Sequence, residues 1–329
     1  MLNPDLKLNE KIFDTDVEKD STRVGYGTGL LALGEKDPNV VALSADLTES
    51  TKADGFAKKY PERFIQVGVA EQNMAAIAAG MGVSGKTVFI SSYATFSPGK
   101  NWETIRTTIV YNNSNVKIAG HHAGTMTGPD GATHQATEDI ASVRPWPGIK
   151  ILVPCDSVQA KLATIASGEE YGPYYLRYSR DKSPIMTTEE TPFEVGKAQT
   201  FWISENPQVV IFATGYMTYH ALVAAKKLEE EGVNVLVTNI HSIKPMDNET
   251  IISQSKQTGA VVTAEDHQIA GGLGGAIAEV LAANHPTPME FVGMRDIFGE
   301  SGKPEEILKK YEMDSEAIYS SVKKVISRK

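Results

Sequence analysis

Cysteine is almost absent from this sequence, with Cys155 the only one among 329 residues. A single thiol excludes an internal disulfide framework and any zinc or iron–sulfur site built from several cysteines. Long apolar runs are missing too, since none approaches the roughly 20 residues that a membrane-spanning helix needs. Residues 1–20 are polar and carry no apolar signal-peptide core. These absences predict a cytoplasmic protein with no membrane partner.

Negatively charged residues outnumber positively charged ones. Lys and Arg number 32 against 41 Asp and Glu, which gives a formal net charge of −9. An acidic surface argues against nucleic acid as a partner, although a small anionic substrate needs only local cations. Hydrophobic residues make up 41% and charged residues 22%, which is typical of a globular protein, and the length suits two domains.

The sequence does contain a regular alternation of strand and helix patterns. Short, continuously apolar runs are typical of parallel strands that are covered on both faces. We predict strands at residues 40–45, 63–67, 87–91, 116–120, 149–154 and 174–178, and then at 209–213, 233–238, 260–264 and 290–292. Helices are predicted at residues 72–83, 102–111, 157–167, 221–231, 273–283 and 315–326. The fold class is therefore α/β, with two parallel-sheet domains.

A stretch with several prolines separates the two series of elements. Pro184, Pro192 and Pro207 lie in or beside this stretch, which breaks the alternation. We predict an N-terminal arm at residues 1–20, a first domain at 21–185, a linker at 186–206 with some strand possible in 193–203, and a second domain at 207–329.

Two glycine clusters precede predicted helical segments. One is Gly25, Gly27 and Gly29, and the other is Gly271, Gly272, Gly274 and Gly275. Neither cluster has the spacing of a dinucleotide-binding fingerprint, and no phosphate-loop motif occurs. We interpret both as helix starts that need a flexible or closely packed backbone.

Histidines gather in one loop that follows a predicted strand. His121, His122 and His134 lie within AGHHAGTMTGPDGATHQATED, at the carboxyl end of the strand, where parallel sheets place ligand sites. Adjacent side chains on an extended backbone point opposite ways, so only one of His121 and His122 should face the cleft. Hydrogen bonding to a polar substrate is favoured, and a metal site formed with Asp130 or a structural role is the alternative, although no HxxxH or HxH spacing supports a metal.

Glu71 lies where a strand ends and the next helix begins. By itself it is explained as an acidic residue in the first turn that interacts favourably with the helix dipole.

Taken together, these segments resemble a known family. GVAEQNM at residues 68–74, YATFSPGKNWETIR at 93–106, HHAGTMTGPDGATHQATEDI at 121–140 and YSR at 178–180 occur in the order of transketolases. The chain resembles their C-terminal half, a pyrimidine-binding domain followed by a C-terminal domain. The family's metal-binding GDG motif is missing, so the resemblance implies the smaller subunit of a split transketolase, which holds no metal itself. A partner, the N-terminal subunit, would bind the diphosphate of thiamine diphosphate with a divalent metal, Mg or Ca, in an α2β2 assembly.

The resemblance implies roles in binding the cofactor. Glu71 matches the glutamate that contacts N1′ of the aminopyrimidine. Phe96 and Trp102 fall in the segment whose aromatic residues stack on that ring, and Asp46 matches a position close to the cofactor.

It also implies roles in binding the substrate. His122 and His134 match positions that reach the sugar or the reactive end of the cofactor, and Asp130 matches an aspartate that contacts an acceptor hydroxyl. Phosphate-binding positions are matched by Arg23, Ser50 and Arg180. The loop reads GPDG where many members have GEDG, so Pro129 removes a charge and stiffens the backbone.

The implied reaction transfers a two-carbon ketol unit from a ketose phosphate to an aldose phosphate. The alternatives are the β subunit of a 2-oxo-acid dehydrogenase, an enzyme similar to deoxyxylulose-phosphate synthase, and an inactive scaffold that only binds a partner. The dehydrogenase β subunit has a similar length, the same two domains and a comparable glutamate, so the histidine loop and the YSR segment are what favour transketolase over it. A deoxyxylulose-phosphate synthase is normally one longer chain.

Overall fold

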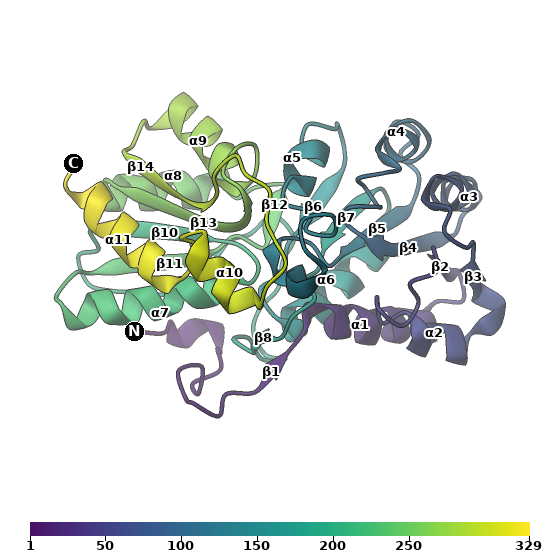
Figure 1. Cartoon of the computed structure of the whole chain (residues 1–329), viewed down its shortest axis with the longest axis horizontal. Helices are drawn as coiled ribbons and strands as arrows, with labels where there is room; N and C mark the ends of the chain where they lie inside the picture. The colour runs from purple at the N-terminus through teal and green to yellow at the C-terminus, as the bar shows by residue number, and fades with distance from the viewer.

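The computed structural model describes residues 1–329 and contains two mainly parallel sheets that lie side by side (Figure 1). The seven-stranded sheet has the order β12-β6-β7-β5-β4-β2-β3. Its strands are β2 (Val40–Ser44), β3 (Phe64–Gln66), β4 (Thr87–Tyr93), β5 (Val116–His121), β6 (Lys150–Leu152), β7 (Tyr174–Arg177) and β12 (Ser242–Lys244). Only β12, at its edge, is antiparallel to its neighbour.

The five-stranded sheet has the order β14-β13-β10-β11-β9. Its strands are β9 (Gln199–Trp202), β10 (Val209–Ala213), β11 (Val235–Asn239), β13 (Val261–Gln268) and β14 (Met289–Met294). The edge strand β9 is antiparallel to β11, and the other pairs are parallel. A two-stranded ladder joins β1 (Lys19–Asp20) to β8 (Ser183–Pro184). The predicted α/β class with two parallel sheets is confirmed.

Helices cover both sheets. They are α1 (Thr22–Lys36), α2 (Asp54–Lys59), α3 (Glu71–Val83), α4 (Trp102–Thr104), α5 (Asp139–Val143), α6 (Ser157–Glu169), α7 (Met217–Glu230), α8 (Asn248–Thr258), α9 (Leu273–Asn284), α10 (Pro304–Lys310) and α11 (Ser315–Ile326). Short 3-10 segments lie at η1 (Pro4–Leu6), η2 (Pro61–Arg63) and η4 (Thr125–Asp130), and α4 continues into a π-helical segment, η3 (Ile105–Val110). Each predicted helix is present, with shifted ends, whereas α1, α8 and the short α2, α5 and α10 were not predicted.

The continuous apolar runs are explained by burial on both faces. Every residue of β2, β10 and β11 is buried. Burying strands on both faces removes the polar alternation that a half-exposed strand would show. None of the helices is long and apolar enough to cross a membrane.

The N-terminal arm packs on the second sheet. The Asn3 amide donates to the Phe201 carbonyl at 2.9 Å, and Leu8 and Ile12 are buried in the core that surrounds β10 and β11. The strand β9 lies inside the stretch predicted as a linker, where some strand was expected, and it belongs to the second sheet. The domain boundaries themselves stay a prediction.

The first glycine cluster does not precede a helix, so that prediction is wrong. Gly25, Gly27 and Gly29 lie inside α1, where Gly25 and Gly29 pack closely against α6 and Gly27 packs against the Lys52 backbone. A Cβ on Gly25 would lie 1.9 Å from the Ser157 carbonyl oxygen. The second cluster does lie at a helix start, because Gly271 has φ +80° and Gly272 is the N-cap of α9.

We predict that Gly25→Ala lowers the free energy of unfolding by about 1–3 kcal/mol, because the added methyl group overlaps the α6 backbone. Denaturant unfolding followed by circular dichroism measures this. The matched control is Gly55→Ala in α2, where no atom lies within 4 Å of the new Cβ. That change should stabilise the protein by up to about 1 kcal/mol. Equal effects of the two substitutions would contradict the close-packing explanation.

Candidate functional site

The predicted site residues converge at one edge of the seven-stranded sheet. Glu71 begins α3 after β3, Phe96 follows β4, His122 follows β5 and Arg180 follows β7. The β2–β3 and β2–β4 pairs and their neighbours run parallel, so these carboxyl ends share one side of the sheet. Ligands of open parallel sheets bind at this side.

Glu71 is held by a cation that sequence reasoning missed. The Glu71 carboxyl is only 3% exposed, and its Oε2 accepts a hydrogen bond from the Lys100 ammonium at 2.8 Å. The Asn101 side chain donates to the Glu71 backbone carbonyl at 3.0 Å. Lys100 lies four residues after Phe96 in the same motif. Its position in that motif is the one sequence feature from which a place near Glu71 could have been predicted. The Lys100 contact fixes Oε2 and leaves Oε1 without a protein donor.

An aromatic cluster joins the predicted aromatic and histidine residues. The rings of Tyr93 and Phe96 stack with centroids 5.8 Å apart and an interplanar angle of 15°. His134 packs edge-on against Phe96 at 5.5 Å, and His122 packs edge-on against Tyr93 at 3.9 Å. Tyr93 was not predicted to belong to the site, although it opens the YATFSPGK motif. The structure therefore brings Phe96, His122 and His134 together through Tyr93.

His122 is buried beside two cations. Arg23 Nη1 lies 3.4 Å from His122 Nε2 and donates to the Ser50 carbonyl at 2.9 Å. Burial, followed by the nearby positive charges of Arg23 and Arg180, lowers the pKa of His122 to about 3. The ring is therefore neutral near pH 7, and it can accept a hydrogen bond from Arg23. His122 Nδ1 and Arg23 Nε are buried without a protein partner, so the site keeps unused polar atoms.

His121 points away from this cluster, as the sequence predicted for one of the two adjacent histidines. Its ring lies between Tyr26 and Tyr178, with centroids 4.8 and 5.1 Å away. Neither ring nitrogen has a protein partner, and burial lowers the pKa of His121 well below its usual value. His121 therefore belongs to the core of the sheet.

Basic residues line a surface cavity of about 610 Å³ beside the histidines. Arg180 Nη1 donates to the Thr127 carbonyl at 2.8 Å and pairs with Asp130 at 3.3 Å. The cations of this cavity are Arg23, Lys52, Arg180 and Lys182, and the anions Asp20 and Asp181 also line it. Lys52 and Lys182 were not predicted, because no motif marks them. The cavity gathers positive charge on an acidic protein.

Trp102 and Asp46 lie outside these contacts. The Trp102 ring packs on Trp146 with centroids 5.1 Å apart, and its Nε1 donates to the Ser142 carbonyl at 3.0 Å. Asp46 has φ +63° and lines, together with Ser50, a separate cavity of about 290 Å³. No group of three or more His, Cys, Asp or Glu side chains is arranged to hold a metal ion, so the metal alternative with His122, His134 and Asp130 gains no support.

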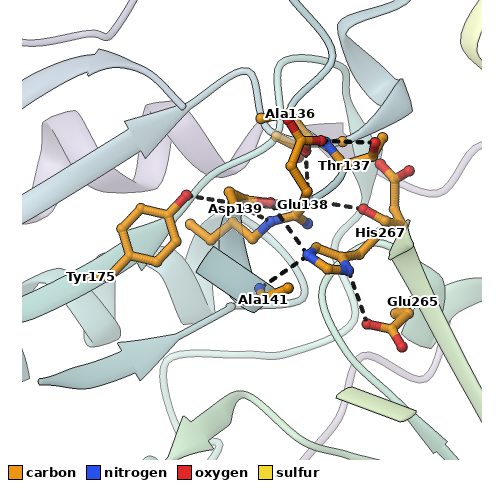
Figure 2. A network of polar contacts seen from close by, with 12 residues as sticks. Ala136, Thr137, Glu138, Asp139, Ala141, Tyr175, Glu265 and His267 are labelled. Carbon is orange, nitrogen blue, oxygen red and sulfur yellow. Dashed lines mark hydrogen bonds and ion pairs between the residues drawn. The ribbon is translucent and has the colours of Figure 1, made fainter. Parts of the chain in front are cut away.

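A buried polar network lies behind the histidine loop, between the two sheets (Figure 2). Tyr175 donates to Asp139, and His267 lies near both Asp139 and Glu265. Burial raises the pKa of Glu265 to about 7, even though two amides at the start of α9 donate to it. Burial lowers the pKa of His267 to about 4. Burial thus shifts both groups toward their neutral forms, as expected for charges removed from water.

Comparison with known families assigns both halves of the chain. Residues 18–185 match the family described as "Transketolase, pyrimidine binding domain", and residues 196–318 match "Transketolase, C-terminal domain". A protein of Methanocaldococcus jannaschii named "Putative transketolase C-terminal section" is 44% identical over 299 residues, which cover 90% of this chain and 93% of that protein.

Other similar proteins carry more specific names. The 6-deoxy-6-sulfo-D-fructose transketolase subunit of a Clostridium species is 36% identical, covering 96% of this chain and 98% of that protein. An apulose-4-phosphate transketolase subunit from Phocaeicola vulgatus is 35% identical, covering 90% and 94%. A solved structure described as a split gene transketolase, inactive beta4 tetramer, has a TM-score of 0.87 at 42% identity, covering 93% of this chain and 98% of that one.

We predict that His122 stays neutral in the folded chain down to about pH 4, since its pKa is lowered from 6.5 to about 3. As pH falls below 6.5, the His122 ring takes up a proton in the unfolded state but not in the folded state. His122 therefore makes the free energy of unfolding fall as pH decreases from 6.5 to about 3. NMR titration of ring carbons, assigned with His122→Gln, measures the midpoint. The urea-unfolded chain is the control and should titrate near pH 6.5. A folded midpoint near 6 would contradict the prediction.

Proposed function

Because the chain belongs to the transketolase family, we propose that it is the subunit of a split transketolase that carries the pyrimidine-binding and C-terminal domains. The reaction we propose is transfer of a two-carbon ketol unit from a ketose phosphate to an aldose phosphate. The observation that carries this proposal is the buried Glu71 carboxyl at the start of α3, next to the segment that also supplies Phe96.

The pyrimidine-binding domain implies thiamine diphosphate as the cofactor. The residues present fit its aminopyrimidine end, because a buried carboxyl group can share a proton with a ring nitrogen and the partly buried Phe96 offers an aromatic face. Thr95 Oγ1 and Asn101 Oδ1 are buried near them without a partner. When bound, thiamine diphosphate supplies the nucleophilic carbon and the electron sink for carbon–carbon bond cleavage.

We assign Glu71 the task of holding a proton against ring nitrogen N1′ of the pyrimidine. The Lys100 ammonium occupies Oε2, so Oε1 is the oxygen available for this contact. Lys100 also fixes the orientation of the carboxyl group before the cofactor arrives, which reduces the entropy that binding must overcome. Phe96 would stack on the pyrimidine, whereas Trp102 would support the segment by packing on Trp146.

The histidines would bind the sugar. His134 Nδ1 contacts the Thr133 hydroxyl at 2.9 Å, which leaves His134 Nε2 for a substrate hydroxyl or for the carbonyl that gains negative charge. His122 is neutral and would act by hydrogen bonding rather than by charge. Asp130 is proposed to contact an acceptor hydroxyl, with Pro129 limiting how its loop can move.

We propose that the basic cavity binds the terminal anionic group of the sugar. Arg23 and Arg180 supply planar guanidinium donors, and Lys52 and Lys182 add charge. Ser50, the remaining residue expected at the phosphate, lines the separate cavity beside Asp46 and reaches this one only through its carbonyl, which accepts a hydrogen bond from Arg23. Two relatives are named for sugars that carry a sulfo or a phosphate group. A sulfonated sugar is therefore the second candidate substrate class, because a sulfonate would use the same cations.

The partner in this proposal is an N-terminal subunit that binds the diphosphate together with Mg or Ca, in an α2β2 assembly. One support is a similar chain whose structure is described as an inactive tetramer of β subunits. A cytoplasmic location stays a prediction.

Assays for 2-oxo-acid decarboxylation and pyruvate condensation test the alternative enzymes, and an absence of turnover in every assay would favour the inactive scaffold.

We predict that Glu71→Ala in the reconstituted two-chain complex lowers ketol transfer by a factor of about 100 or more, while the complex still assembles. Coupled assays with a ketose phosphate and an aldose phosphate measure turnover, and size-exclusion chromatography measures assembly. The matched control is Glu62→Ala, since the Glu62 carboxyl is 69% exposed. Normal turnover by the Glu71 variant would reject the role of this carboxyl, and turnover by this chain alone would reject the split site.

Arg180→Met is predicted to raise KM for a phosphorylated aldose about tenfold or more, because it removes a guanidinium from the basic cavity. KM for an aldehyde without phosphate should hardly change. Steady-state kinetics of the reconstituted complex measure both values. Arg295→Met is the control, since Arg295 is exposed in the C-terminal half. Equal changes in KM for both acceptors would rule out a phosphate contact.

A further inference from the structure

The loop that carries the histidines is held by the C-terminal half of the chain. We define the histidine loop as residues 121–137. Asp266, in β13, reaches across from the second sheet and is only 5% exposed. Its Oδ1 accepts hydrogen bonds from the Thr125 amide at 2.9 Å and the Thr125 hydroxyl at 2.6 Å, and its Oδ2 accepts from the Met126 amide at 3.4 Å.

These contacts make Asp266 a cap supplied by another part of the chain. Thr125 and Met126 open the 3-10 segment η4, and their amides would otherwise lack acceptors. Asp266 is 141 residues away from Thr125 in the sequence. A buried carboxylate that accepts several N–H and O–H donors forms charge-assisted hydrogen bonds, which are stronger than neutral ones.

The backbone of the loop is shaped to meet the C-terminal half. Gly124 has φ +76°, and a Cβ there would lie 2.1 Å from Asp266 Oδ2. Gly131 has φ +75°, and its Cβ would lie 2.6 Å from Ser301 Oγ. Glycine is required at both positions because a side chain would be strained and would also overlap the opposing group.

The far end of the loop is held as well. The Gln268 amide donates to the Thr137 carbonyl at 2.7 Å, and the Gln135 side chain donates to the Glu300 carbonyl at 3.0 Å. Arg177 Nη2 donates to both the Ala136 and Asp266 carbonyls, at 3.2 and 2.8 Å. Figure 2 shows Ala136 and Thr137 close to His267, the neighbour of Asp266 in β13.

The 3-10 segment η4, which Asp266 caps, is hydrogen-bonded to the backbone of His122 and lies close to that of His134. The Thr127 hydroxyl donates to the His122 carbonyl at 2.6 Å and lies 3.4 Å from the His134 carbonyl. Thr127 directly follows the amides that Asp266 caps. A shift of η4 would therefore move the backbone that carries both rings.

We propose that the C-terminal half positions the histidine loop for substrate binding, and that Asp266 is its principal positioning residue. Asp266 acts through the loop backbone and does not itself contact the substrate. The effect on substrate binding rests on the function proposed above, whereas the effect on loop order does not.

Hydrogen–deuterium exchange of the full-length chain tests the loop directly. Asp266→Asn removes the charge and replaces one acceptor oxygen with a donor, so amide exchange within residues 121–137 should become about tenfold faster or more. The matched control is Asp314→Asn, because Asp314 caps α11 by accepting the Ala317 amide at 3.0 Å in the same half of the chain. The control should leave exchange of the loop unchanged.

A second variant covers the case in which Asp266→Asn does not fold. Thr125→Val removes the hydroxyl contact with little change in shape and should also speed exchange in the loop, whereas Thr125→Ser should restore protection. Unchanged exchange in the loop, or exchange that rises equally throughout the chain, would overturn the proposal.

The reconstituted complex tests the consequence for substrate binding. Asp266→Asn should raise KM for the acceptor about tenfold, with a smaller effect on kcat, while Asp314→Asn changes neither. An unchanged KM despite faster exchange would overturn the positioning role. If the unsubstituted complex shows no ketol transfer, the function proposed above fails, and the exchange result still decides whether Asp266 orders the loop.

Discussion

The buried ion pair of Arg177 and Asp139 is the interaction on which the site depends. Arg177 Nε lies 2.7 Å from Asp139 Oδ2, and the two side chains are 7% and 1% exposed. Burial alone would lower the pKa of Arg177 and raise that of Asp139, but each partner reverses the shift in the other. Removing one member of such a pair costs about 3–5 kcal/mol because the other charge is left buried and unpaired. Through its carbonyl contacts, Arg177 also joins the end of the histidine loop to β13.

Sequence patterns could predict the features that depend on neighbouring residues. Continuous apolar runs marked the strands, and the carboxyl ends of those strands placed Glu71 and His122 at one edge of a sheet. The patterns did not reveal α1, because its glycines were interpreted as residues that precede a helix, whereas Gly25 and Gly29 lie inside it and allow close packing with α6. They also missed Lys100 and Asp266, whose contacts depend on segments brought together only by the fold. Trp102 lay in the right segment, but its ring packs on Trp146, a partner that spacing alone does not identify.

The electrostatics of the site follow from local arrangement rather than from net charge. The chain carries a formal charge of −9, yet four basic side chains gather around one cavity. Burial, together with the charges of Arg23 and Arg180, lowers the pKa of His122 to about 3 and keeps its ring neutral. The same surroundings therefore suit the anion-binding role proposed above and maintain a histidine that interacts by hydrogen bonding. Lys100 acts separately, by binding one oxygen of Glu71.

Strand β12 has a consequence for how the chain folds. It belongs to the second half of the sequence but pairs with β6 at the edge of the first sheet. Cutting the chain between residues 186 and 206 would leave β6 with unpaired amides and carbonyls, a surface prone to association with other strands. During synthesis, β12 cannot pair with β6 until residues 242–244 have left the ribosome, so completion of the first sheet depends on the second half of the chain.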